Sequence, residues 1–304
     1  MAKWELNKAQ KGQKEKLINL LQADYSAFIS QAIKIKVPHS SAHNPKFRFS
    51  DVHSYNYGDL KRKYSVDGEV NASLIENPDG LNFIAMEYPT AGTINAANEL
   101  LQKSKCGLVI SLIGDHPPWE SDFLDISYTC DKVFSPEEFI SYAIENKADI
   151  NSISAYYADM HGIIKEENGN FLIEKHTSRN SLSDIIFRIK CMCWIDKTPP
   201  TGNLVKTLDI LKSVWESMHL SSGPVTVHCL AGVGRTGTFI FYNMFRTAIM
   251  NAGGAAIGEA EKISLFVELF LYLRSKRTWM VENKDQLMFL YKLLIDKNKK
   301  NFDA

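Results

Sequence analysis

The chain has 304 residues, of which 45% are hydrophobic and 23% charged, and its 35 basic residues balance 35 acidic ones. This composition excludes disorder as the main state, because so many apolar residues can be buried in a sizeable core. The zero formal net charge argues against a protein that coats nucleic acid or an anionic membrane, and no apolar run approaches the roughly 20 residues of a membrane span.

The predicted elements follow from the spacing of apolar residues along the chain. Residues 13–33 carry apolar side chains at three- and four-residue steps, which predicts an amphipathic helix. A polar stretch follows, up to about residue 63. The strands predicted after it are 70–75, 82–86, 107–113, 185–194 and 225–229. The helices predicted after it are 93–102, 204–218, 235–250, 259–274 and 283–295.

The middle of the chain carries two local signals. Ser135-Pro136-Glu137-Glu138 is typical of the start of a helix. Residues 153–176 are predicted to form a β-hairpin, because Asn168-Gly169 is a strong hairpin-turn signal.

Strands and helices interleave throughout, which predicts a single α/β domain with a mixed sheet. We expect three parts: an N-terminal helical segment, 1–36, that packs on the domain; the domain itself, 37–296; and a frayed tail, 297–304, with a run of lysines.

Five cysteines without framework spacing favour reduced thiols and a cytoplasmic, reducing compartment. The N-terminus also lacks the apolar core of a secretory signal. Cys191 and Cys193 would point to the same face of a strand. No second cysteine pair or histidine cluster accompanies them, so we predict no metal site and no cofactor.

The most informative segment is Val227-His228-Cys229-Leu230-Ala231-Gly232-Val233-Gly234-Arg235-Thr236-Gly237. A predicted buried strand ends at a cysteine, and a five-residue loop with two glycines returns to an arginine at the start of a helix. Glycines let backbone N–H groups converge, and a helix N-terminus adds free N–H groups and a positive dipole end. Together they predict a phosphate-sized anion site in which a thiolate is favoured.

The simpler interpretation is a buried strand cysteine followed by an ordinary tight turn. That interpretation leaves unexplained why a histidine, a cysteine, two glycines, an arginine and a threonine fall in one register.

This segment resembles the H-C-x5-R-(S/T) signature of the protein tyrosine phosphatases. Other segments resemble the same family in the same order: 44–52 its phosphotyrosine-recognition loop, 70–73 and 83–85 its I-N-A-S and F-I-A strands, 194–196 its W-P-D loop, and 281–286 its Q-T-x-x-Q loop. The resemblance runs from about residue 40 to 295 and is weak across 114–180. It implies the family's fold, a twisted mixed β-sheet flanked by helices.

The resemblance also implies catalytic roles. Cys229 would attack phosphorus and form a cysteinyl-phosphate. Arg235 would hold the equatorial oxygens, and Asp196 would protonate the leaving phenolate and then act as base on water. His228 would orient the loop and favour the thiolate, and Thr236 would hydrogen-bond the departing sulfur.

The resemblance further implies which residues bind the substrate. The backbone N–H groups from Leu230, Ala231, Gly232, Val233 and Gly234 to Arg235 would bind the phosphate. Asp51 would hold the substrate backbone. Phe49 would stack on the substrate ring, keeping the stacking face of the family's tyrosine without its hydroxyl. Without the resemblance, Asp196 and Asp51 would be read as turn formers and Phe49 as core.

Two positions depart from the family pattern. Ile195 replaces the proline of the W-P-D loop, which predicts slower or less stable loop closure. Glu282 replaces the first glutamine of Q-T-x-x-Q, and a carboxylate beside a phosphoryl group is repulsive unless protonated or paired. Gln286, the second glutamine, is retained, but Glu282 puts the positioning of water in doubt.

The implied function is that of a hydrolase, an active protein tyrosine phosphatase on phosphotyrosine proteins or peptides, whose loop would also bind phosphate or other oxyanion inhibitors. One alternative is a phosphoinositide or inositol-polyphosphate phosphatase with the same loop. Another is a phosphotyrosine-binding module with little turnover, favoured only by Glu282 and Ile195. The sequence also leaves open export as a bacterial effector that acts in a host cytosol.

Overall fold

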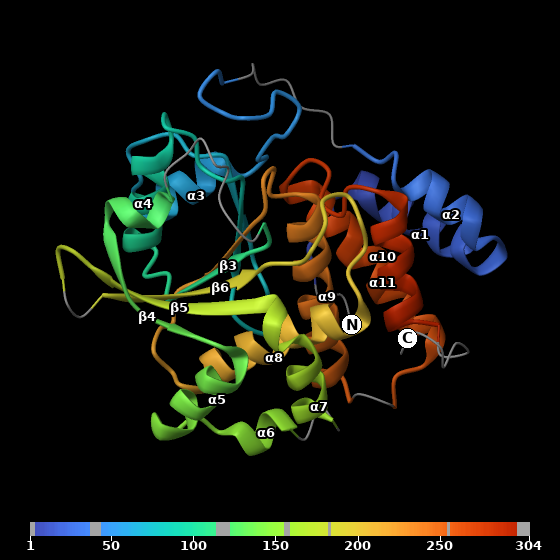
Figure 1. Cartoon of the computed structure of the whole chain (residues 1–304). Helices are drawn as coiled ribbons and strands as arrows, with labels where there is room; N and C mark the ends of the chain where they lie inside the picture. The colour runs from blue at the N-terminus through green and yellow to red at the C-terminus, as the bar shows by residue number, and fades with distance from the viewer. Residues whose placement is uncertain are drawn as a thin grey trace.

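A central mixed sheet organises the computed structural model, which describes residues 4–36, 44–113, 122–154, 159–181, 184–253 and 256–296 (Figure 1). In these ranges seven strands pair in the order β1-β2-β7-β3-β6-β5-β4. The strands are β1 (Ala72–Ile75), β2 (Phe83–Met86), β3 (Leu108–Ser111), β4 (Tyr128–Phe134), β5 (Phe171–Ser178), β6 (Ile185–Cys191) and β7 (Val225–His228). Neighbours among β2, β7, β3 and β6 are parallel, and the outer pairs are antiparallel.

Helices cover both faces of this sheet (Figure 1). They are α1 (Lys8–Ala23), α2 (Tyr25–Ala32), α3 (Tyr57–Tyr64), α4 (Ile94–Lys103), α5 (Pro136–Glu145), α6 (Ile150–Ser154), α7 (Met160–Glu167), α8 (Gly202–Ser217), α9 (Gly234–Asn251), α10 (Glu259–Lys276) and α11 (Lys284–Leu294). The smaller of two hydrophobic clusters lies under α3 and α4, and the larger one under α5 and α8–α11. Because both faces are covered, the central strands are apolar runs buried along their whole length.

The predicted single α/β domain with a mixed sheet is confirmed. The helix start at Ser135 is also confirmed. Its hydroxyl accepts from the backbone N–H of Glu138, and the Glu138 carboxylate accepts from the Ser135 N–H, which forms a capping box. The expected tail, 297–304, lies outside the described residues.

The predicted hairpin over 153–176 is wrong. Residues 160–167 form α7, which begins where Asp159 accepts a hydrogen bond from the N–H of Gly162. Asn168–Asn170 form a short 3₁₀ turn between α7 and β5. The strand partners of β5 are β4 and β6, which come from other parts of the chain. The Asn-Gly signal therefore marks the reversal from helix to strand, because a turn former fits both contexts.

The helix predicted over 13–33 is two helices, which meet at Asp24. The Asp24 carboxylate accepts from the N–H of Ala27 and begins α2, while its own backbone ends α1 in an extended conformation. Both helices join the large hydrophobic cluster, to which α1 contributes Leu17 and Leu21. In the part of the chain that the structure describes, no helix is both long and apolar enough to cross a bilayer.

We predict that Leu17→Ala destabilises the protein by about 2–5 kcal/mol, because the side chain is 2% exposed and its removal leaves a cavity. Urea unfolding of the full chain measures this change. Asn19→Ala, at an exposed position of the same helix, is the matched control. Equal stability of the two variants would show that α1 is not part of the cooperative core.

Candidate active site

The loop after β7 places Cys229 between a central parallel strand and the N-terminus of α9. Cys229 follows His228, the last residue of β7, and α9 begins at Gly234. The sulfur accepts a hydrogen bond from the Gly232 N–H at 3.3 Å. Cys229 is 3% exposed and lines a cavity of about 410 Å³. The strand–loop–helix predicted from the sequence is present, with the cysteine at its centre.

Gly232 and Gly234 both lie so close to other segments that a side chain would not fit. Gly232 has φ +67°, and a Cβ there would lie 2.1 Å from the carbonyl oxygen of Met86. A Cβ at Gly234 would lie 2.6 Å from a carboxylate oxygen of Glu282. The first glycine lets the loop turn against β2, and the second lets residue 282 approach the start of α9.

The carbonyl groups of the loop are held away from the cavity by partners behind it. The Arg277 side chain donates from Nε to the carbonyl of Gly232 and from Nη2 to that of Ala231, both at 2.9 Å. The Tyr88 N–H donates to the carbonyl of Leu230 at 3.0 Å. With three successive carbonyls bound from behind, the N–H groups of the loop are left to face an anion.

Arg277 is a functional residue that sequence reasoning missed. It is completely buried, and burial lowers the pKa of its guanidinium to about 10, which leaves it charged near pH 7. Nearby Glu87 opposes that shift. The only signal in the sequence was an arginine at the end of a long apolar helix, and such residues are usually exposed.

Arg235, in the first turn of α9, meets Asp196, which lies in the segment between β6 and α8. Asp196 lies 2.9 Å from Nη2 of Arg235, and Nη1 donates to the carbonyl of Trp194 at 3.0 Å. The Arg235 side chain is 7% exposed, whereas that of Asp196 is 58% exposed. The arginine therefore fixes the 194–196 loop at two points, with the carboxylate at the mouth of the cavity.

Hydrogen bonds within the 194–198 turn stabilise it around Ile195, the position at which the resembled family has proline. The Thr198 hydroxyl donates to the carbonyl of Ile195 at 2.8 Å, and the Trp194 indole N–H donates to the carbonyl of Thr198 at 3.0 Å. The Ile195 side chain is 71% exposed. The turn is thus stabilised by its neighbours, and residue 195 contributes little packing to it.

His228 lies fully buried among aromatic rings. Its ring centroid is 5.6 Å from that of Tyr88 and 5.4 Å from that of Phe123, and neither ring nitrogen has a partner among the described residues. Burial lowers the pKa of His228 to about 3, so the ring is neutral near pH 7. Its predicted role in orienting the loop stays a prediction. The Thr236 hydroxyl is also buried without a partner in those ranges, and its predicted bond to sulfur stays a prediction.

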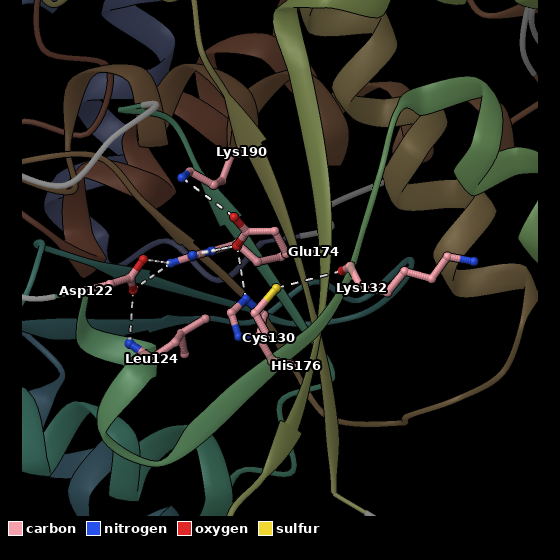
Figure 2. Close-up of polar contacts among 8 residues, drawn as sticks. Asp122, Leu124, Cys130, Lys132, Glu174, His176 and Lys190 are labelled. Carbon is pink, nitrogen blue, oxygen red and sulfur yellow. Dashed lines mark hydrogen bonds and ion pairs between the residues drawn. The ribbon is translucent and has the colours of Figure 1, made fainter.

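A cluster of buried ion pairs on β5 and β6 supports this region (Figure 2). Arg188 bonds to Glu174 at 2.6 Å and to Asp122 at 2.7 Å, and His176 lies 3.0 Å from Glu174. Burial tends to raise the pKa of Glu174, but His176, Arg188 and Lys190 outweigh it and lower it to about 2.

Asp122 connects that cluster to the active-site histidine. Its carboxylate accepts from the Leu124 N–H at 3.1 Å and begins the 3₁₀ helix Phe123–Ile126. The Phe123 ring in turn packs edge-on against His228. The ion pairs are therefore joined to the ring contact of His228 through Asp122 and the 3₁₀ helix.

The cavity brings together residues from four parts of the chain. Its lining is Phe49, Asp51, Val52, Asp196, Lys197, Cys229, Leu230, Ala231, Val233, Gly234, Trp279 and Glu282. Most of the predicted site residues are in this set. Lys197 and Trp279 were not predicted, since single residues outside the motifs gave no signal. Both have positive φ, +59°, and so lie in tight turns at the rim.

Gln286 does not line the cavity. It is completely buried, its side-chain oxygen accepts from the Glu282 N–H at 3.2 Å, and its Nε2 donates to the Thr198 carbonyl at 3.4 Å. The residue joins the 281–286 segment to the end of the 194–196 loop. Its predicted role in positioning water stays a prediction.

Glu282 faces the cavity beside the start of α9. Burial raises the pKa of its carboxyl group. Lys197 and Arg235 lower it, whereas Asp196 and Asp51 raise it further. The positive charge of Lys197 therefore offsets part of the negative charge of Glu282, which the sequence did not reveal.

The two neighbouring cysteines form no visible metal site. Cys191 is buried and Cys193 exposed, and both thiols are free. The described ranges contain no group of three or more His, Cys, Asp or Glu side chains that could hold a metal ion.

Comparisons with known proteins agree with this geometry. A family model described as protein-tyrosine phosphatase matches residues 43–296. The chain is 26% identical over 270 residues to protein-tyrosine-phosphatase PTP1 of Arabidopsis thaliana, covering 84% of this chain and 71% of that protein. It is 26% identical over 225 residues to tyrosine-protein phosphatase 3 of Schizosaccharomyces pombe, covering 73% and 69%.

Other matches are shorter or structural. Tyrosine-protein phosphatase 3 of Dictyostelium discoideum is 32% identical over 102 residues, which are 10% of that protein. A structure of PTPN18 in complex with HER2 phosphopeptides covers 95% of this chain and 93% of its own, with a TM-score of 0.58 and 16% identity, so that it shows the fold alone.

The fold and the catalytic loop define the class, a hydrolase of phosphoric monoesters. The chain belongs to the protein-tyrosine phosphatase family, whose model covers it from residue 43 to residue 296.

We predict that Gly232→Ala abolishes most binding of inorganic phosphate, because the new Cβ meets the Met86 carbonyl and φ is positive. Isothermal titration of the folded variant with phosphate measures the loss. Gly169→Ala, where a Cβ meets nothing within 4 Å, is the matched control. Wild-type affinity in Gly232→Ala would show that the loop does not form the anion site.

Proposed function

We propose that this chain hydrolyses phosphotyrosine in proteins, with Cys229 as nucleophile, Arg235 as phosphate ligand and Asp196 as general acid. The observation that carries the proposal is that Cys229 and Asp196 line one cavity, while Arg235 bonds the Asp196 carboxylate and the Trp194 carbonyl. Asp196 precedes Cys229 and Arg235 by more than 30 positions in the chain. Ordinary packing gives no reason for a cysteine, an arginine and an aspartate to gather at a helix N-terminus.

The chemistry proceeds in two displacements. The Cys229 thiolate attacks phosphorus, the bond from phosphorus to the phenolic oxygen breaks, and Asp196 gives that oxygen its proton. A water then attacks phosphorus, its proton passes to the Asp196 carboxylate, and the bond to sulfur breaks to release phosphate and the thiolate. Arg235 and the loop N–H groups stabilise the charge on the equatorial oxygens throughout.

Substrate binding requires Arg235 to exchange partners. In the structure its guanidinium bonds Asp196 and the Trp194 carbonyl. A phosphoryl group matches the same planar fork with two oxygens and so competes for it. We propose that the phosphate displaces the Asp196 carboxylate from Arg235, which frees Asp196 to reach the leaving oxygen.

The charges of the cavity favour an aryl monophosphate over an inositol polyphosphate. Its lining includes three carboxyl groups, of Asp51, Asp196 and Glu282, beside a single lysine, Lys197. Additional phosphates would meet these carboxylates, which repel them. Phe49 and Trp279 are aromatic residues of the lining, against which an aromatic ring can pack. A phosphotyrosine protein or peptide is therefore the proposed partner, and phosphate or other oxyanions are proposed inhibitors.

We also propose a cellular compartment and the bounds of the catalytic domain. Five free thiols, one of them the nucleophile, favour a reducing compartment such as the cytoplasm. The catalytic domain is proposed to extend over 37–296. The segment 1–36 would pack on it, and the contacts of α1 with α10 support that assignment, among them the bond from Gln10 Nε2 to the Leu271 carbonyl.

The decisive experiment compares Cys229→Ser and Asp196→Ala with the wild type on a phosphotyrosine peptide. We expect no turnover from the first variant and a loss of roughly 10²–10⁴ in kcat from the second, because general acid catalysis contributes that much. Cys130→Ser, at an exposed position on edge strand β4, is the cysteine control. Turnover by Cys229→Ser would overturn the mechanism.

The same assay separates the alternatives. A wild-type burst of one phosphate per protein, followed by no turnover, would indicate a binding module. Preference for inositol polyphosphates over phosphotyrosine peptides would indicate the other phosphatase class. Capture of phosphotyrosine peptides by Asp196→Ala is the result that the proposal requires.

We also predict that Glu282→Gln raises kcat/KM for phosphotyrosine peptides severalfold near pH 8. A carboxyl group whose pKa is raised by burial is protonated at low pH and ionised at high pH, so its repulsion of the phosphate grows as pH rises. The gain over the wild type should therefore shrink toward pH 5. A constant ratio across this range would show that the charge of Glu282 does not act on the substrate.

A further inference from the structure

Glu87 carries a buried carboxyl group behind the cavity. This carboxyl group has no role in the two displacement steps. It follows Met86, the last residue of β2, which pairs in parallel register with His228 at the end of β7. Glu87 is 1% exposed. It therefore lies beside the point where the catalytic loop leaves the sheet. A charged group at such a position is costly unless partners compensate it.

One oxygen of this carboxylate holds the substrate-recognition segment 48–52. Oε1 accepts from the backbone N–H of Arg48 at 3.2 Å. Arg48 directly precedes Phe49, which lines the cavity together with Asp51. The position of the cavity wall that would contact the substrate ring is thus fixed in part by Glu87.

The other oxygen reaches the catalytic loop through two side chains. Oε2 accepts from the Asn71 side-chain amide at 3.1 Å, and the same amide donates to the carbonyl of Val52 at 3.0 Å. The Asn71 oxygen accepts from Nη1 of Arg277 at 2.6 Å. Arg277 in turn binds the carbonyls of Gly232 and Ala231. A continuous set of hydrogen bonds therefore joins the recognition segment to the phosphate-binding loop.

We propose that Glu87 is a positioning residue of this enzyme, which holds the recognition segment and the phosphate-binding loop in one fixed arrangement through Arg48, Asn71 and Arg277. The proposal rests on the function proposed above. Glu87 touches no reacting atom, so it acts through the geometry of the two walls.

The protonation state of Glu87 decides how firmly it holds the recognition segment and the phosphate-binding loop together. Burial raises the pKa of its carboxyl group from 4.5 to about 7, while the charge of Arg277, the Arg48 N–H and charge and the Asn71 amide act against the shift. The ionised form accepts at both oxygens and attracts Arg277. The protonated form carries a hydrogen on one oxygen and weakens one of the two connections. The link is therefore strongest above pH 7.

Glu87→Gln tests this link, since the amide has the same shape and one acceptor oxygen at every pH. We expect KM for a phosphotyrosine peptide to rise roughly three- to tenfold at about pH 8.5, the effect of one lost hydrogen bond of ordinary strength, with a smaller change in kcat. At about pH 5.5, where wild-type Glu87 is protonated, the two proteins should be nearly equal. Glu137→Gln, at an exposed position of α5, is the matched control.

A purely structural role predicts a different result. Loss of packing alone would change activity by the same factor at every pH at which both proteins are folded, and a constant ratio would overturn the proposal. Stability gives a second measure. Because the folded state binds the Glu87 proton more tightly, wild-type stability relative to Glu87→Gln should fall as pH rises from about 4.5 to about 7.

The experiment also separates this proposal from the proposed function. Absence of wild-type turnover would overturn the function alone. The Glu87 link would then be read from phosphotyrosine-peptide binding by Cys229→Ser with and without Glu87→Gln at the two pH values. If Glu87→Gln does not fold, NMR titration of the wild type decides. The Arg48 backbone amide and the Asn71 side-chain amide should shift together with a midpoint near 7, and independent or absent shifts would overturn the proposal.

Discussion

The site depends on the direction in which the peptide groups of one loop point. An anion is held by backbone N–H groups only if the carbonyls of the same peptide groups face away from it and still find partners. Here Arg277 and the Tyr88 N–H bind three successive carbonyls from behind, at Leu230, Ala231 and Gly232. A fully buried cation is costly to desolvate, and these hydrogen bonds, with Glu87 and Asn71, offset that cost.

The electrostatics of the site also depends on individual neighbouring groups. The chain is neutral overall, yet Lys197 and three carboxyl groups, of Asp51, Asp196 and Glu282, line the cavity. Asp196 pairs with Arg235, and the charges of Lys197 and Arg235 act on Glu282. In a low-dielectric pocket such short-range pairs outweigh the net charge of the whole molecule. Selection for an aryl monophosphate thus depends on where individual groups lie, and much less on long-range attraction.

Sequence patterns predicted the parts of the fold whose signals are local. The strand, glycine loop and helix around Cys229 were predicted because a buried strand, two glycines and a helix start each have a characteristic composition. The hairpin over 153–176 was wrong because Asn168-Gly169 specifies only a turn. Whether helix or strand precedes such a turn is set by partners elsewhere, here β4 and β6 for β5.

The sequence by itself predicted the proposed nucleophile, its arginine and the loop between them, since these lie within a few residues and their chemistry depends on local backbone geometry. Only the tertiary structure decided which distant groups complete the site. Arg277, Glu87 and Lys197 carry no motif, and each acts because folding brings it within hydrogen-bond or ion-pair reach of the loops at 48–52, 194–198 and 229–235. Contacts across such separations are fixed by the packing of the sheet and helices, which no short window of sequence encodes.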